Sequence, residues 1–223
     1  MTRNPKEIPI FPLGVVLLPE MNMPLHIFEE RYKVMINGCL KRNEPFGIVY
    51  FDGEKIHKVG CTAHIVQVLK QYDDGRMDIM VQGVKRFYMD QTDDSRPYLV
   101  SRIFYIDDTE ETVSAEDHAL YRKVIDLFRA LNQLTGYGGE TDRLDDVDPR
   151  RLSFMIPGAE GFSLEEKQQF LEMTSSRERL KKSLRVLGKV IDRAKINREI
   201  VEIIGGNGHV RAYLATKDWR LDG

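Results

Sequence analysis

The 223-residue sequence has little cysteine, no long apolar run and no large excess of one charge. Two cysteines, Cys39 and Cys61, are too few for a disulfide framework or a four-cysteine zinc site. No apolar segment approaches the roughly 20 residues of a membrane-spanning helix, and proline interrupts the N-terminus before a signal-peptide core forms. The net charge of −2 gives no reason to expect a polyanionic partner. We therefore expect a cytoplasmic protein without a membrane partner, and the charge balance argues against a nucleic-acid partner.

Motifs for catalysis or for a bound cofactor are also missing. Cys61 and His64 lie three residues apart in a predicted strand, so their side chains point to opposite faces and are not expected to share a metal. The acidic segment 142–148 lacks the central glycine and the glutamate of a calcium-binding EF-hand. The glycine-rich segment 205–208 is not followed by the lysine of a phosphate-binding loop. We predict a protein that is not an enzyme and holds no metal or cofactor.

The N-terminal region instead combines proline with short apolar runs, Ile8–Phe11 and Val15–Leu18. Its prolines are Pro9, Pro12, Pro19 and Pro24. Because proline cannot donate to a strand ladder and fixes φ, it favours strand edges, strand starts and turns. The region thus predicts short strands that change direction sharply. A helix is predicted next from the spacing of the apolar residues Phe28, Tyr32, Met35, Ile36, Cys39 and Leu40.

Residues 46–105 have the pattern of a β-sheet. Apolar runs of strand length recur through this region, and residues 73–75, Asp-Asp-Gly, are typical of a hairpin turn between two of them. Short strands at this spacing predict a twisted, barrel-like sheet.

The second half has the periodicity of helices, with apolar residues every three or four positions over 120–134 and 180–194. Ser163 and Ser175 are each followed by glutamate three residues later, which is the pattern of a capping box. Asp148 before a proline predicts another helix start. We predict an α+β fold in three parts: a β-rich subdomain over residues 8–110, an α-helical subdomain over 114–204 and a tail over 205–223.

The N-terminal pattern resembles the Lon substrate-binding domain, the N-terminal domain of the ATP-dependent Lon proteases, which also occurs as a free-standing protein. The matching residues there are Pro9, Phe11, Pro12, Leu13, Val16, Leu17, Pro19, Pro24, Leu25, Ile27, Phe28, Glu30, Arg31 and Tyr32. The resemblance continues at Phe46–Val49, Val59–Ala63 and Gly83–Phe87, and it covers about residues 8–190. It implies a PUA-like β subdomain followed by a helical bundle, without the ATPase and protease domains of those enzymes.

The resemblance implies binding of unfolded or degron-bearing protein segments, in association with a protease or chaperone. The methionine-rich segment around Pro24 suits a surface that accepts many apolar sequences, and charged residues at the helix start would form its polar rim. The predicted contact residues are Met21, Met23, Leu25, His26, Phe28, Glu29, Glu30 and Arg31. Alternatively, the apolar members of this set plug one end of the sheet.

Two other predictions stay open from the sequence. Some PUA-like folds bind RNA, and Lys85, Arg86 and Arg102 offer basic side chains for an RNA-binding module, although the balanced overall charge argues against it. The apolar stripe on the last predicted helix either packs within the bundle or pairs with a second copy, which would form a homodimer.

Overall fold

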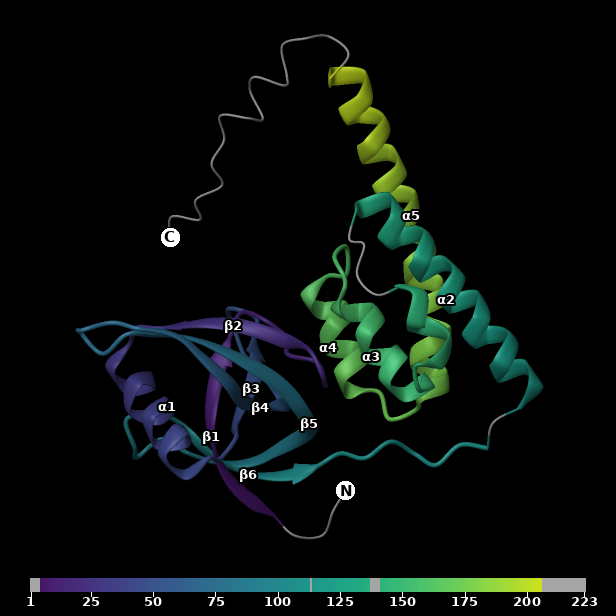
Figure 1. The fold of residues 1–223 in the computed structure, drawn as a ribbon. Coiled ribbons are helices and arrows are strands. Elements are labelled where there is room, and N and C mark those ends of the chain that lie inside the picture. Colours follow the sequence, from purple (N-terminus) through teal and green to yellow (C-terminus); the bar gives the residue numbers. More distant parts are fainter. Residues whose placement is uncertain (1–4, 113, 137–140, 206–223) are drawn as a thin grey trace.

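The computed structural model describes residues 5–112, 114–136 and 141–205, which form an α+β fold (Figure 1). The first half contains the strands β1 (Lys6–Leu13), β2 (Asn22–Ile27), β3 (Phe46–Phe51), β4 (Ile56–Gln71), β5 (Met77–Asp93) and β6 (Val100–Tyr105), with helix α1 (Glu30–Arg42) after β2. The second half contains α2 (Ala115–Thr135), the 3-10 helix η1 (Thr141–Asp146), α3 (Pro149–Gly158), α4 (Leu164–Glu172) and α5 (Ser176–Gly205). The predicted fold class, with strands before helices, is confirmed.

The strands form one mixed sheet that closes into a ring. Their order is β2-β5-β4-β3-β1-β6, and the end of the long strand β5 also pairs with β6. β1 and β3 are parallel, whereas the other neighbours are antiparallel. The predicted hairpin turn lies between β4 and β5, where Gly75 has a φ of 82°. Glycine adopts this positive φ readily because it has no Cβ.

Helix α1 packs its apolar side against the core of the sheet. Tyr32, Met35, Ile36 and Cys39 are buried, as their spacing predicts. The helix begins at Glu30, however, which is later than predicted. Phe28 precedes α1, and its side chain is 58% exposed. Phe28 is therefore a surface residue and not the first member of the buried stripe.

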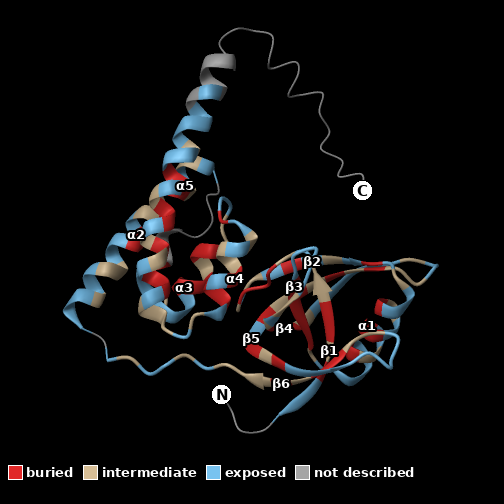
Figure 2. Cartoon of the chain, turned by 180° about the vertical axis from the view of Figure 1, so that it is seen from behind, coloured by how far each residue is buried: buried red, intermediate tan, exposed pale blue. Residues whose placement is uncertain are grey.

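A second core lies where the helices meet (Figure 2). Its buried residues include Val124, Phe128 and Leu131 of α2, Phe170 of α4, and Leu187 and Ile191 of α5. The apolar stripe of α5 thus packs within the bundle along most of its length. Further along the helix, Ile196 and Ile200 are exposed, and the homodimer stays a prediction. Residues 206–223, almost all of the predicted tail, lie outside the described residues.

Capping side chains mark the starts of α3, α4 and α5. Asp148 accepts the backbone N–H groups at the start of α3, and Ser163 forms the predicted capping box of α4. At the start of α5, the Ser175 hydroxyl accepts the N–H of Glu178 at 3.0 Å. The same hydroxyl donates to Glu111, in the segment that follows the sheet, at 2.5 Å. The start of α5 is therefore tied to the segment that connects the two halves.

A buried ion cluster joins the sheet to the helices. Asp108, which follows β6, has a side chain only 2% exposed. It accepts hydrogen bonds of 2.5 to 2.8 Å from Arg86 on β5 and Arg179 on α5. Both arginines are buried, and both donate to backbone carbonyl groups at the end of α4, of which Met173 is shared. Segments far apart in the sequence thus meet at one carboxylate.

A second ion pair connects the starts of α2 and α5. Arg177 donates to the two carboxylate oxygens of Asp117 at 2.6 and 2.8 Å, and the Ser114 N–H donates to the same group at 2.7 Å. The hydrogen bond from Arg177, followed by those from Ser114, lowers the pKa of Asp117 to about 2. Because the pKa of Asp117 is lower in the folded than in the unfolded protein, its ionised carboxylate stabilises the fold. This stabilisation is complete above about pH 4 and is lost as the pH falls towards 2.

Replacing Asp117 with asparagine is expected to lower the urea midpoint of unfolding at about pH 7. The difference from wild type should shrink between about pH 4 and pH 2, because the wild-type carboxyl then takes up its proton and loses the ion pair. Asp192→Asn, at an exposed position of α5, is the control and should leave the midpoint unchanged. A difference that persists undiminished at pH 2 would show that the ion pair is not its source.

Candidate functional site

The residues around the start of α1 divide between core and surface. β2 pairs with β5 so that Met23 lies opposite Val81 and Leu25 opposite Ile79. Met23 is buried, and Met21 and Leu25 are partly buried against the same core. Met23 is thus a core residue, whereas Met21 and Leu25 keep part of their surface accessible, and contact between these residues and a client stays a prediction. The other predicted contact residues stay at or near the surface, and we call them the α1 surface: His26, Phe28, Glu29, Glu30 and Arg31.

The ring of Phe28 rests on a side chain that is itself held by a hydrogen bond. Its ring stacks on His26 with centroids 5.8 Å apart, and His26 contacts Asp78 of β5 at 2.6 Å. The Tyr72 hydroxyl donates to the other oxygen of Asp78 at 2.8 Å. Hydrogen bonds from His26 and then Tyr72 hold the pKa of Asp78 below its usual range. The charged acceptor thus fixes His26, and His26 positions the half-exposed ring of Phe28.

The charged residues of the α1 surface are engaged with their neighbours. Arg31 binds Glu29 at 2.8 Å, and its guanidinium lies 4.6 Å from the centre of the Tyr32 ring. Lys33 donates to Glu30 at 2.7 Å and to the carbonyl oxygen of residue 74 in the β4–β5 turn at 2.9 Å. These contacts form a polar rim around apolar groups and fasten α1 to the hairpin.

A cavity of about 420 Å³ opens beside Arg31. Its apolar lining comes from Pro12, Tyr32, Phe51, Ile56, Pro97 and Tyr98, and we call it the aromatic cavity. Arg31, Asp94 and Arg96 also line it. The Phe51 side chain is 41% exposed. Because Arg31 belongs to both the cavity and the α1 surface, the two form one continuous region with apolar groups and charged side chains.

The three basic residues considered for RNA binding do not form a basic surface. Arg86 is buried in the ion cluster with Asp108, and Arg102 binds Asp90 through hydrogen bonds of 2.5 and 3.0 Å. Lys85 lies 5.6 Å from the centre of the Tyr105 ring. Since nucleic-acid binding depends on a concentrated positive surface, the structure gives no support to this alternative.

The thiols lack the properties of nucleophiles or metal ligands. Burial raises the pKa of the Cys61 thiol to about 12 and that of Cys39 to about 11. Both are protonated at neutral pH, whereas a thiolate is the form that attacks substrates or binds metals. In the described part of the chain, no cluster of three or more histidine, cysteine or acidic residues is placed to hold a metal ion. No helix in that part has the length and apolar character needed to cross a membrane.

Residues 7–189 match the family model described as the ATP-dependent protease La (LON) substrate-binding domain. The match covers most of the chain. The chain belongs to the Lon substrate-binding domain family. The resemblance inferred from the proline-rich N-terminus is thereby confirmed.

Bacterial Lon proteases share this domain with the chain. The Lon protease of Wolbachia pipientis subsp. Culex pipiens is 27% identical over 209 residues, which cover 84% of the chain and 25% of the relative. The Lon protease of Anaeromyxobacter dehalogenans is 25% identical, with coverage of 91% and 25%. The chain thus spans about a quarter of the length of these relatives.

Solved structures of Lon N-terminal domains have the same fold. The N-terminal domain of the Mycobacterium avium complex Lon protease superposes with a TM-score of 0.68 and 20% identity, covering 82% of the chain and 98% of that structure. A Lon N-terminal domain protein from Xanthomonas campestris gives a TM-score of 0.63 and 19% identity, with coverage of 80% and 97%. The ring of strands and the helical half are therefore the architecture of Lon substrate-binding domains.

Proposed function

We propose that this Lon substrate-binding domain binds apolar segments of unfolded or degron-bearing proteins, which we call clients, through the α1 surface and the aromatic cavity. The observation that carries the proposal is the continuity of the two. Phe28 is exposed on one side, Phe51 opens into the cavity on the other, and Arg31 belongs to both. An apolar centre with a polar rim is the usual anatomy of a protein-binding surface.

The affinity for a single segment is expected to be weak. Full burial of a phenylalanine side chain contributes about 1.5–3 kcal/mol, and an unfolded client loses conformational entropy when it binds. Contacts made by a few rings therefore give reversible binding that accepts many sequences. Such binding suits a domain that holds clients and does not act on them chemically.

The domain is proposed to work with a partner in the cytoplasm. Its relatives are Lon proteases, so a protease or chaperone is the class of protein that we propose receives the client. We propose that the domain itself is not an enzyme, because its described site offers apolar and paired charged groups and no activated nucleophile.

Replacing Phe28 or Phe51 with aspartate is expected to weaken client binding about ten-fold each, and about a hundred-fold together. Each change removes an exposed ring and places a charge where an apolar side chain would be buried. The measurement is fluorescence anisotropy with a labelled test protein that is kept unfolded by reduction and carboxymethylation.

Ile196→Asp is the matched control, because Ile196 is an exposed apolar residue (55% exposed) on the distant part of α5. It should bind like wild type, and all variants should keep the wild-type thermal unfolding midpoint. Equal binding by the phenylalanine variants and the control would exclude this surface. If the wild-type domain binds no unfolded protein at all, the proposed function fails.

A further inference from the structure

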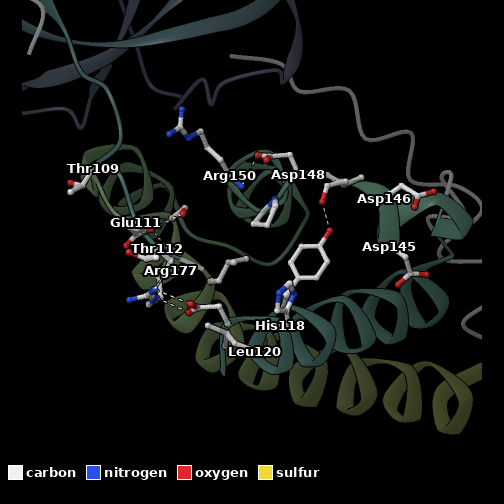
Figure 3. Close-up of a pocket in the computed structure, with 16 residues that line it drawn as sticks. Thr109, Glu111, Thr112, His118, Leu120, Asp145, Asp146, Asp148, Arg150 and Arg177 are labelled. Atoms are coloured by element: carbon white, nitrogen blue, oxygen red, sulfur yellow. Dashed lines mark hydrogen bonds and ion pairs between the residues drawn. The ribbon is translucent and has the colours of Figure 1, made fainter. Parts of the chain in front are cut away.

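A cavity of about 740 Å³ lies in the helical half (Figure 3). It is lined by the segment after the sheet, the first turns of α2, the end of η1, the first turn of α3 with the two residues before it, and the start of α5. Its floor is apolar, formed by Leu120, Tyr121, Val147 and Leu180. The volume falls within the range of about 300–1,000 Å³ that is typical of ligand sites.

The walls of this cavity carry more negative than positive charge. Five carboxylates line it, those of Glu111, Asp117, Asp145, Asp146 and Asp148, against the two guanidinium groups of Arg150 and Arg177. At one end the charges are matched, since Arg177 binds Asp117 (Figure 3). The other end holds Asp145 and Asp146. Asp145 binds Arg129 at 2.6 Å, whereas the described residues provide no ion-pair partner for Asp146.

The surroundings of Tyr121 indicate that a ligand of this cavity should carry a positive charge. Its hydroxyl donates to the carbonyl oxygen of Val147 and lies 3.1 Å from that of Leu144. The hydroxyl proton of Tyr121 is thus already donated within the protein and is not available to bind an anion. The neighbouring carboxylates would also repel an anion. Burial raises the pKa of Tyr121, and the charges of Asp145, Asp148 and Asp146 raise it further. A cation would be attracted by these carboxylates, and the aromatic side chain of Tyr121 lines the same cavity.

We propose that this cavity binds an arginine or lysine side chain of a client. The aliphatic stem packs on Leu120, Tyr121 and Leu180, and the charged head lies beside Asp146 and Asp148. Long basic side chains suit such a site because their stems are apolar and their heads are charged. That the side chain belongs to a client rests on the proposed function. The site itself is separate from the aromatic cavity. A client with one apolar and one basic anchor would therefore be favoured.

The first test uses a small probe of the same chemistry, n-butylguanidinium, with n-butylurea as its neutral counterpart. In an NMR titration of the full chain, butylguanidinium should shift the backbone amides of Tyr121, Asp146 and Val147 in a saturable way, and butylurea should not. Asp146→Asn should weaken the binding about ten-fold, as expected for loss of one charged contact. Asp192→Asn, an exposed aspartate of α5, should leave it unchanged.

Two results of this titration would overturn the proposal. Equal shifts with butylurea would show that only the apolar floor binds. Equal weakening by Asp146→Asn and Asp192→Asn would show general attraction to an acidic surface. Because the probe is not a protein segment, the titration is independent of the proposed function. If the domain binds the probe but no unfolded protein, the cation site is supported and the proposed client-binding function fails.

The second test asks whether the cation comes from a client. Two unstructured peptides that differ only in arginine or citrulline at one position are compared by anisotropy. Wild type should prefer the arginine peptide several-fold, and Asp146→Asn should lose the preference while Phe51→Asp keeps it at lower affinity. Absence of a preference in a wild-type domain that binds butylguanidinium would assign the cavity to a free cation and overturn the proposal.

Discussion

Replacing Asp108 with alanine is expected to lower the free energy of unfolding by about 3–5 kcal/mol. The carboxylate lies between Arg86 and Arg179, whose side chains are 4% and 0% exposed. Removing it leaves two buried guanidinium groups without a counter-charge, and the carbonyl groups that they also contact carry only partial charges. Burial lowers the pKa of Arg86, and the charge of Asp108 opposes this shift.

The measurement is chemical unfolding followed by circular dichroism. Asp107→Ala is the control, because this neighbouring aspartate is exposed and should change the free energy of unfolding by less than about 0.5 kcal/mol. Arg150→Ala should cost less than about 1 kcal/mol, since Arg150 reaches Asp108 at 3.1 Å with a side chain that is 60% exposed. An Asp108 variant as stable as the Asp107 variant would show that the cluster contributes no net stability.

Much of the fold follows from local patterns in the sequence. The spacing of Tyr32, Met35 and Ile36 predicts the buried face of α1, and glycine at position 75 marks the β4–β5 turn. These signals are local because helix periodicity and turn preference depend on neighbouring residues. The closure of the ring is different, because it requires β1 to pair with β3 and β6, contacts that no local pattern specifies.

The candidate site was predictable only in part. The methionine-rich segment looked like a turn because of Pro24, yet β2 forms a ladder with β5 over this segment. The alternation of that ladder, and not the composition, decides that Met23 is buried. Phe51 and Tyr98 were missed because they are far apart in sequence and meet only in the folded chain.

The basic residues show the same limit. Arg86 counted as a surface cation in the sequence, because nothing near it indicates that Asp108 and the end of α4 enclose it. A charged residue within a β-strand pattern is normally assigned to the solvent face. Burial of Arg86 depends on a partner 22 residues away along the chain, which a local pattern does not reveal.

Replacing Gly83 with alanine is expected to destabilise the protein by about 3 kcal/mol, at the upper end of the cost of overpacking. A Cβ at this position of β5 would overlap the carbonyl oxygen of Leu18. The backbone of Gly83 also donates to the Met21 carbonyl at 2.9 Å and accepts from the Glu20 N–H at 2.7 Å. The close approach therefore fixes the turn before β2, and relief of the overlap would break these two hydrogen bonds.

The effect of Gly83→Ala should reach the client-binding region. Because the turn leads directly into β2, its displacement would move His26 and the ring of Phe28 that rests on it. We expect faster hydrogen exchange of the β2 amides and weaker binding of the unfolded test protein. Gly14→Ala is the control, since a Cβ there meets nothing within 4 Å. If Gly83→Ala lowers stability but leaves exchange in β2 and client binding unchanged, the turn does not position the α1 surface.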